Sequence, residues 1–391
     1  MSNKVAVIGT GMTKSGTSPV PSWLLFAEAA KEAIVEAGIA LTDIEALHVG
    51  NAYSAFSECQ TNIAPLCLSS IGISTYIPSQ RYEGACCSGS FAFRQGYLNI
   101  LSGVYEIMLV GGTERLKAVP GSLVQEAMAT SMDINERNAG LTFAAYWALV
   151  AKAYGRKYGL SEEKLQDLLA EISVKNHYHG SFNKLAHFQK QVDCAAVMKS
   201  PMVSPPVKLL DCCPFSDGAA AIVLASEEIA KKYSSTPIWV EGSGGASGRF
   251  QIAEVEDLST NPAIKRAAEE AFKYAKLTPK DIDIVEAHDC VNIHEVIQLE
   301  AMGFYPYGEG IYAAAERKTY FDGQQPVSLS GGLKARGHPV GATGVYQICE
   351  ITRQLRGDWD GIQPNKTPQI GMTVNIGGTG TTVTTHILRK G

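Results

Sequence analysis

Residues 29–52, AAKEAIVEAGIALTDIEALHVGNA, align without a gap to residues 267–290, AAEEAFKYAKLTPKDIDIVEAHDC. Each stretch has the apolar spacing of an amphipathic helix, followed by a short turn that contains an aspartate and then by a strand-like apolar run. The two strands are predicted at Ile44–Val49 and Ile282–Ala287. The chain therefore repeats an α/β unit, and this repeat is the main indication of its fold.

Matching segments surround the two copies. In each half a Gly/Ser-rich turn leads into a helix, which is predicted from Ser88 onward in the first half and from Gly341 onward in the second. The strands predicted around the copies are Val5–Gly11, Glu106–Gly111, Ile238–Gly245 and Gly371–Gly377. Strands that alternate with helices at this spacing predict a layered α/β fold with mainly parallel strand pairing.

The chain is predicted to divide into two halves, residues 1–235 and 236–391, with an insertion at about 118–208 in the first half. Two helices are predicted within the insertion, at Leu141–Tyr158 and Ser161–Lys175. Long excursions from a compact α/β unit are usually lids or binding loops, so we expect the insertion to cover the functional site. Asp211–Ser226 then returns as a strand of the first half.

Composition limits the possible partners and the compartment. The 391 residues are 45% hydrophobic and 19% charged, with a formal net charge of -5, which argues against nucleic acid or an anionic membrane as the main partner. The nine cysteines form no CxxC ladder, and their odd number fits free thiols in a reducing compartment, so no metal site is expected. The start, MSNKVAVIG, resembles no signal peptide, and we expect a cytoplasmic protein.

A first chemical motif surrounds Cys86, in the stretch EGACCSGS of residues 83–90. The thiol precedes the helix that is predicted from Ser88, and the amides at a helix N-terminus favour the thiolate. Gly84 and Gly89 allow a tight bend and the close approach of a substrate. The plainer alternative is a buried structural cysteine, which is common for an isolated thiol.

Three further motifs lie in the second half. His338, in GHPVGATG (residues 337–344), is held extended by the following proline and could take a proton from a thiol. His288 and Cys290, in the triplet HDC, follow a predicted strand, where α/β folds bind their ligands. His288 could donate a hydrogen bond to a thioester carbonyl, and Cys290 could act as acid or base. The glycine loop NIGGTG (residues 375–380) offers unhindered amides suited to an oxyanion hole, or is a plain turn.

Together these motifs resemble the thiolase family, in particular its sterol-carrier-protein-type branch, over essentially the whole chain. Residues 86–89 fit the family's C-x-[ST]-G motif, and residues 337–339 fit G-H-P. Other thiolases carry a second thiol in a C-terminal C-x-G-G-x-G loop, at the position of Asn375. The sterol-carrier-protein branch instead has H-D-C-F, which residues 288–290 fit, with Val291 in place of the phenylalanine.

The resemblance implies a five-layered α-β-α-β-α fold with two duplicated βαβαβ-type halves and an inserted loop domain. It implies that Cys86 is the nucleophile, that His338 is its base and that Cys290 is the proton carrier. The amides of Cys86 and Gly377 would form the oxyanion hole, and His288 with His338 would hold the enolate oxygen. Coenzyme A would be a substrate, with no metal. We expect it to bind in the insertion, where Lys175, Lys184 and His177 are candidates for contacts to its phosphates.

The expected activity is that of a CoA-dependent thiolase of the acetyl-CoA C-acyltransferase type, which cleaves or forms a 3-oxoacyl-CoA by Claisen chemistry, as in β-oxidation or its reverse. One alternative is a thiolase for a bulky or aromatic 3-oxoacyl-CoA, such as benzoylsuccinyl-CoA, that acts with a small zinc-ribbon/OB-fold partner protein. A ketoacyl synthase would also use one cysteine and two histidines, but it needs no second thiol at Cys290. A non-catalytic CoA- or lipid-binding scaffold is a further alternative.

The resemblance also implies a homodimer or a dimer of dimers. The opening Gly9-x-Gly11 hints at a dinucleotide site, but the third glycine of that motif is missing.

Overall fold

The computed structural model describes residues 4–73 and 76–391. Two segments lie outside the described residues: residues 1–3, part of the start that resembles no signal peptide, and residues 74–75, part of the predicted first half. Its centre is a nine-stranded sheet in the order β3-β2-β4-β7-β1-β8-β11-β10-β9. The strands are β1 (Val5–Met12), β2 (Ala46–Gly50), β3 (Ser79–Tyr82), β4 (Ile107–Glu114), β7 (Gly218–Ser226), β8 (Ile238–Ser247), β9 (Ile284–Glu286), β10 (Ile370–Gly377) and β11 (Thr382–Lys390). A separate pair joins β5 (Met202–Ser204) and β6 (Val207–Lys208). The strand that was predicted within residues 211–226 is β7.

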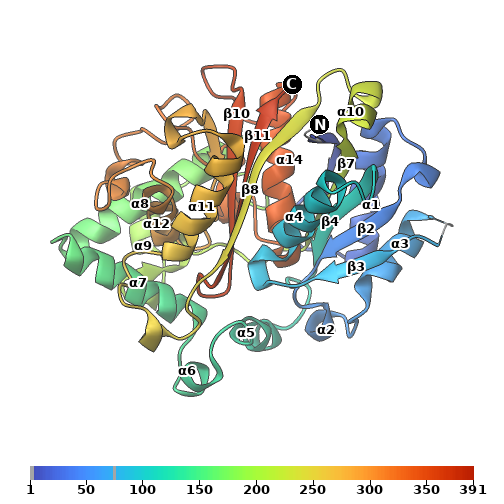
Figure 1. Cartoon of the computed structure of the whole chain (residues 1–391). Helices are drawn as coiled ribbons and strands as arrows, with labels where there is room; N and C mark the ends of the chain where they lie inside the picture. Colours follow the sequence, from blue (N-terminus) through green and yellow to red (C-terminus); the bar gives the residue numbers. More distant parts are fainter. Residues whose placement is uncertain (1–3, 74–75) are drawn as a thin grey trace.

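The sheet shows the predicted duplication. Away from the centre, the order β1-β7-β4-β2-β3 of one half matches the order β8-β11-β10-β9 of the other. Among the described residues, no strand of the second half corresponds to β3. In its place, a single parallel bridge joins Val285 of β9 to Val327. The two half-sheets meet where β1 pairs with β8 over two residue pairs, so the repeat builds one continuous sheet (Figure 1).

Strand direction differs from the expectation. Only β2 with β3, β2 with β4 and β9 with β10 pair in parallel, among the strands that the structure describes. The other neighbours run antiparallel, so the prediction of mainly parallel pairing is wrong. The short turn at residues 378–381 reverses the chain between β10 and β11, and a reversal this short can only join antiparallel strands.

Helices complete five layers, as the resemblance implies. The middle layer consists of α4 (Ser88–Leu101) and α14 (Thr343–Arg356), which pack on each other and on strands of both half-sheets (Figure 1). The outer face of the first half is covered by α1 (Ser22–Ala37) and α3 (Ile63–Ile71). The outer face of the second half is covered by α11 (Pro262–Ala275), with α12 (Asn292–Ala301) beside it. Both helices of the middle layer thus follow directly after the two predicted Gly/Ser-rich turns.

Glycines bring the outer helices close to the first strand of each half. A Cβ atom at Gly11 would lie 1.9 Å from the carbonyl oxygen of Ala29, and one at Gly244 would lie 1.9 Å from the carbonyl oxygen of Ala267. Ala29 and Ala267 occupy the same position of the sequence repeat. The glycine pattern at Gly9 and Gly11 therefore serves helix packing on β1, which accounts for it without a dinucleotide.

The segment between β4 and β7 is mostly helical. It contains α5 (Gly121–Ala129), α6 (Ile134–Asn138), α7 (Phe143–Lys157), α8 (Glu162–Gly180) and α9 (Cys194–Lys199). The two helices predicted here are α7 and α8, and Ser161 caps α8 by accepting a hydrogen bond from the amide of Lys164. In Figure 1, α5 and α6 lie at the lower edge of the molecule, between the two halves. The remaining helices are α2 (Ser54–Ser57), α10 (Glu227–Tyr233) and α13 (Gly332–Ala335).

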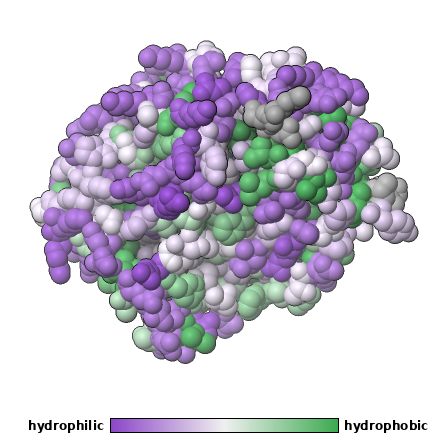
Figure 2. Space-filling view, viewed as in Figure 1, coloured by the Kyte–Doolittle hydropathy of each residue, from purple (hydrophilic) through white to green (hydrophobic). Residues whose placement is uncertain are grey.

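The surface is mixed in character. Figure 2 shows hydrophilic residues over most of the left side of this face, while hydrophobic residues gather to the right of its centre. Among residues 4–73 and 76–391, no helix combines the length and the apolar character needed to cross a membrane.

Candidate active site

Three of the predicted site residues meet at one point. The sulfur of Cys86 and one ring nitrogen each of His288 and His338 lie within 4.8 Å of one another. All three side chains are buried. Cys86 comes from the turn before α4, His338 from the turn before α14 and His288 from the end of β9. The duplicated fold thus brings together motifs that lie more than 200 residues apart in the chain.

The turn that carries Cys86 has an unusual backbone. Ala85 has a φ of 51°, in the left-handed region that side chains other than glycine rarely adopt. The hydroxyl of Ser88 donates to the carbonyl of Ala85 across 2.6 Å and accepts from the amide of Gly84 across 3.0 Å. These bonds hold the strained turn and fix the direction of the neighbouring thiol.

Burial changes the expected state of this thiol. It raises the pKa of Cys86 to about 12, with the neighbouring Cys87 adding to the shift, and this outweighs the lowering by nearby backbone amides. The backbone amides favour the thiolate, as expected for this turn, but burial has the larger effect. The resting thiol keeps its proton, and a base has to remove it.

His338 has the tautomer that such a base needs. The hydroxyl of Thr343 donates to the carbonyl of Pro339 across 2.9 Å, so its oxygen accepts the proton on Nδ1 of His338 across 2.6 Å. Nε2 of His338 is then unprotonated, and it has no hydrogen-bond partner among the described residues. Burial, with a smaller effect of Arg336, lowers the pKa of His338 to about 3, so the ring is neutral and free to accept a proton.

His288 has the opposite tautomer. Its Nδ1 lies 2.9 Å from the side-chain nitrogen of Asn375, which donates, so its own ring proton is on Nε2. Burial lowers the pKa of His288 well below its usual value, with His338 adding to the shift, and the ring is neutral. The site therefore contains one imidazole that accepts a proton and one that offers a hydrogen bond. Asn375, at the position of the missing thiol, orients the second.

Cys290 lies beside this cluster. Its sulfur is 3.2 Å from Nδ1 of His294, and its carbonyl accepts from the amide of Cys213 across 2.9 Å. Burial raises the pKa of Cys290 well above its usual value, and the nearby Cys213 and Cys86 raise it further. Cys290 is thus a protonated thiol at rest, with an imidazole next to it that the sequence did not point out.

The glycine loop also reaches the nucleophile. The backbone amides of Gly378 and of Cys86 itself point toward the Cys86 sulfur and act to lower its pKa. The preceding residue, Gly377, packs on the turn of Cys86, since a Cβ atom there would lie 2.1 Å from the carbonyl oxygen of Gly84. Within this loop, the amide that acts on the thiol is that of Gly378, one residue beyond the predicted Gly377.

A buried carboxylate ties the two turns together. Glu114, at the end of β4, accepts from the amides of Ala52, Tyr53 and Gly341 at 2.9–3.2 Å. Burial raises its pKa to about 7, although these three amides favour the charged form. The residue therefore fixes the loop that follows His338 against the first half of the fold.

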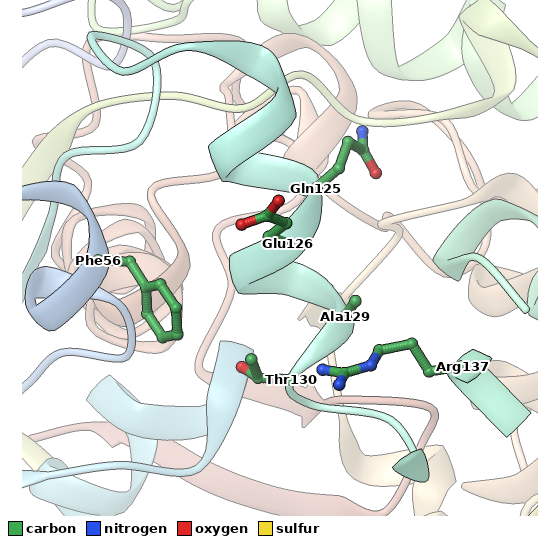
Figure 3. Close-up of a pocket in the computed structure, with 6 residues that line it drawn as sticks. All are labelled: Phe56, Gln125, Glu126, Ala129, Thr130 and Arg137. Atoms are coloured by element: carbon green, nitrogen blue, oxygen red, sulfur yellow. The ribbon is translucent and has the colours of Figure 1, made fainter. Parts of the chain in front are cut away.

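Helix α5 separates Cys86 from the surface. Val124, Ala127 and Met128 of α5 pack in one hydrophobic cluster with Cys86. The outer side of the same helix lines a pocket of about 600 Å³ (Figure 3). The lining residues are Phe56, Gln125, Glu126, Ala129, Thr130 and Arg137. One helix of the insertion therefore lies between the thiol and an open pocket.

The candidates for contacts to phosphate have different surroundings. Lys175 is fully buried and paired with Glu295, so its ammonium is not accessible to a phosphate, and this candidate is wrong. His177 is buried and bonded to the carbonyl of Lys190. Lys184 is exposed and pairs with Asp360.

One thiol and two imidazoles at this separation are also ligand types that a zinc ion accepts. Nδ1 of His338 is bonded to Thr343, and Nδ1 of His288 is bonded to Asn375. Only Nε2 of each ring is left to act within the cluster. The same arrangement suits proton transfer from the thiol, and this second use needs no ion.

The duplicated fold and the buried thiol–imidazole cluster define an α/β enzyme. Residues 5–203 match the family model described as "Thiolase, N-terminal domain", and residues 244–390 match "Thiolase C-terminal domain-like". The chain belongs to the thiolase family.

Individual relatives agree with this assignment. The chain is 42% identical to an acetyl-CoA acetyltransferase of Methanothermobacter thermautotrophicus, over 99% of both chains. It is 31% identical to the benzoylsuccinyl-CoA thiolase subunit BbsB of Thauera aromatica, over 97% of this chain and 96% of the relative. It is 32% identical to sterol carrier protein 2 of Gallus gallus, over 91% of this chain and 66% of that longer protein.

The fold is also that of a solved structure, described as "Ltp2-ChsH2(DUF35) aldolase". The two superpose with a TM-score of 0.82, over 99% of this chain and 97% of the other, at 22% sequence identity. At this identity the likeness concerns the fold alone.

Proposed function

We propose that this protein is a CoA-dependent thiolase of the acetyl-CoA C-acyltransferase type, which forms or cleaves a short 3-oxoacyl-CoA. The observation that carries the proposal is the cluster of Cys86, His338 and His288 within 4.8 Å, in which the two imidazoles have opposite tautomers. Nucleophilic attack needs a base beside the thiol, and the charge that develops on a carbonyl oxygen needs a donor.

In the direction of cleavage, Nε2 of His338 takes the proton of the Cys86 thiol as the sulfur attacks the keto carbon of the 3-oxoacyl-CoA. The alkoxide collapses, the carbon–carbon bond breaks, and its electron pair leaves as the enolate of acetyl-CoA. The thiol of Cys290 gives its proton to this carbanion. The products of this half-reaction are acetyl-CoA and an acyl group on Cys86.

Free CoA completes the cycle. Protonated His338 first returns its proton to the Cys290 thiolate. It then takes the proton of the CoA thiol, which attacks the acyl group on Cys86, and gives that proton to the departing Cys86 sulfur. The amides of Cys86 and of the Gly377–Gly378 turn stabilise the oxyanion on the acyl carbon. The Nε2 proton of His288, with that of protonated His338, stabilises the enolate oxygen. Condensation is the same sequence in reverse.

Identity of 42% to an acetyl-CoA acetyltransferase supports a short acyl chain. Identity of 31% to a benzoylsuccinyl-CoA thiolase subunit supports the alternative of a bulky or aromatic 3-oxoacyl-CoA. A ketoacyl synthase is disfavoured, since both matching family models are those of thiolases and since a second thiol, Cys290, lies beside the cluster.

Assembly and place in the cell are part of the proposal. We propose a cytoplasmic homodimer or dimer of dimers, built from chains that divide into halves at about residue 235. The sheet ends at β3, whose outer edge suits pairing with a second copy. A small zinc-ribbon/OB-fold partner protein is supported by the DUF35 protein named with the solved structure of the same fold.

The activity is tested by thiolysis of acetoacetyl-CoA, followed by the loss of its enolate absorbance when CoA is added. A panel of branched and aromatic 3-oxoacyl-CoAs, with and without the candidate partner protein, ranks the substrates. We expect acetoacetyl-CoA to be cleaved and the Cys86→Ser variant to be inactive. Absence of thiolysis with every substrate, or full activity of Cys86→Ser, would contradict the proposal.

A further inference from the structure

His294 faces the proton carrier of the proposed reaction. It lies in the first turn of α12, and its Nδ1 is 3.2 Å from the sulfur of Cys290. Both side chains are buried, with exposed fractions of 1% and 2%. Nε2 of His294 has no hydrogen-bond partner among the described residues. The thiol of Cys290 is the only side chain that shares a hydrogen bond with this ring among those residues.

His294 is held in place by a contact to its ring and by a hydrogen bond to its backbone. The indole of Trp147, on α7 of the insertion, stacks on it with ring centroids 4.0 Å apart and an angle of 32° between the planes. The side-chain nitrogen of Gln298 donates to the carbonyls of both His288 and His294 across 2.8 Å. Gln298 therefore fixes the backbone of both His288, in the cluster, and His294, beside Cys290.

The electrical surroundings keep both partners neutral at rest. Burial raises the pKa of the Cys290 thiol, as described above. Burial also lowers the pKa of His294 to about 3, and Lys334 adds to this shift. The titratable or charged groups around the pair are Cys86, Cys213, His288, Asp289, Lys334 and Tyr146. A neutral imidazole next to a protonated thiol can accept its proton without any change in net charge.

We propose that His294 is a positioning residue that holds the Cys290 thiol and accepts its proton when the enzyme condenses two acyl groups. This inference rests on the proposed thiolase function and adds a residue to it. In condensation, Cys290 has to remove a proton from the methyl group of acetyl-CoA, and a thiolate does this far better than a thiol. Transfer of the sulfur's proton to Nδ1 produces that thiolate.

The step balances. The S–H bond of Cys290 breaks as an N–H bond forms on Nδ1 of His294, and this gives a thiolate beside an imidazolium. The thiolate then takes the α-proton, and the enolate attacks the acetyl group on Cys86. As the Cys86 thiolate leaves, it receives a proton from Cys290 by way of His338, and His294 returns its proton to the Cys290 sulfur. No oxidant, reductant or further reactant is needed.

Two half-reactions separate this role from a structural one. Exchange of the acetyl-CoA methyl protons with solvent deuterium, followed by mass spectrometry, reports on Cys290. Exchange of labelled CoA into acetyl-CoA reports on Cys86 and His338 alone. The variant His294→Asn keeps a polar group that can hold the thiol but cannot take its proton. His294→Phe keeps a ring on Trp147 and has no nitrogen.

We expect both variants to slow the methyl exchange by at least about tenfold, within the range of general-base effects, with His294→Phe the slower. The exchange of labelled CoA should change by less than about threefold. Above pH 7 the methyl exchange of the variants should rise roughly tenfold per pH unit, because solvent then has to form the thiolate. In the unaltered protein it should be nearly flat, because the proton moves within the pair.

The contrary results are equally distinct. Equal losses in both half-reactions, or methyl exchange in the variants with the rate and the flat pH profile of the unaltered protein, would overturn the role of His294 while leaving the thiolase function in place. If one variant does not fold, which its thermal melting reveals, the other decides. If the unaltered protein catalyses neither exchange, the proposed function fails and this inference fails with it.

Discussion

Thr343 accepts a hydrogen bond from Nδ1 of His338 across 2.6 Å, and this contact determines which nitrogen of the imidazole is free. The hydroxyl proton of Thr343 is already used on the carbonyl of Pro339. The threonine can therefore only accept from the ring, and it leaves Nε2 as a base. A residue that touches no reacting atom thus sets the chemistry of one that does.

Replacing this acceptor should reduce activity without removing the base. In Thr343→Val the shape is kept but the Nδ1 proton loses its partner, so the ring no longer prefers one tautomer. We expect kcat/KM for thiolysis to fall by about 10- to 100-fold, a part of the 10²–10⁴-fold that a positioned base contributes. Thr343→Ser, which keeps the hydroxyl, is the matched control and should retain most of the activity. Equal activity of the valine and serine variants would show that the contact does not orient His338.

Asn375 provides the corresponding test for His288. An aspartate at this position accepts a proton from Nδ1, so Asn375→Asp should reverse the tautomer and remove the donor on Nε2. The loss of one such donor reduces kcat by about 10²–10³-fold. Rates of acetoacetyl-CoA cleavage at saturating substrate measure the effect. If Asn375→Asp retains the full kcat, Nε2 of His288 is not the donor to the enolate oxygen.

The pH dependence of the thiol follows from the two shifted pKa values. Cys86 has its pKa raised to about 12 and His338 has its pKa lowered to about 3, so the neutral pair persists throughout the physiological range. In the unaltered protein, alkylation of Cys86 by iodoacetamide should change by less than about threefold between about pH 6 and 9, since His338 takes the proton internally. In His338→Ala the thiolate has to form through solvent. Its fraction then rises about tenfold per pH unit below the raised pKa.

Mass spectrometry of the Cys86 peptide measures these alkylation rates, with the exposed Cys59 as a reference in the same sample. A titration step in the unaltered protein near pH 6–7, with faster alkylation above it, would instead indicate an ion pair of ordinary pKa.

The close approach of helix and strand predicts matched effects in the two halves. Gly11→Ala and Gly244→Ala each place a Cβ atom 1.9 Å from a helix carbonyl oxygen, so backbone has to move. We expect each to lower the free energy of unfolding by about 1–3 kcal/mol. Gly16→Ala, where a Cβ would have no neighbour within 4 Å among the described residues, is the control and should stay within about 0.5 kcal/mol. Denaturant unfolding curves give all three values, and equal stabilities would mean that the helices can shift freely.

The repeat between residues 29–52 and 267–290 predicted the halves of the sheet, because apolar periodicity and turn residues are local properties of the chain. Strand direction was not predictable in the same way. It depends on where β7 enters the sheet after the long insertion and on the tight turn that leads into β11. The local apolar pattern of the chain does not indicate the direction of either strand.

The site shows the same limit. Motifs in the sequence pointed to Cys86, His288, Cys290 and His338, and the structure brings the first, second and fourth within 4.8 Å. The contact of Asn375 with His288 spans 87 residues and exists only in the fold. His294 had no such signal, because Cys290 lies two residues before α12 and the contact of its sulfur with His294 exists only in the fold. The protonated state of Cys86 could not be foreseen, because it results from burial by segments such as α5.

Acylation of Cys86 is the step on which the proposed mechanism depends, and one measurement tests it directly. The protein is mixed with acetyl-CoA, quenched in acid and digested, and its peptides are weighed. We predict one acetyl group on Cys86, one equivalent of released CoA, and neither in Cys86→Ser. Turnover of acetyl-CoA with an unmodified Cys86, or with the acetyl group on Cys290 instead, would contradict the account.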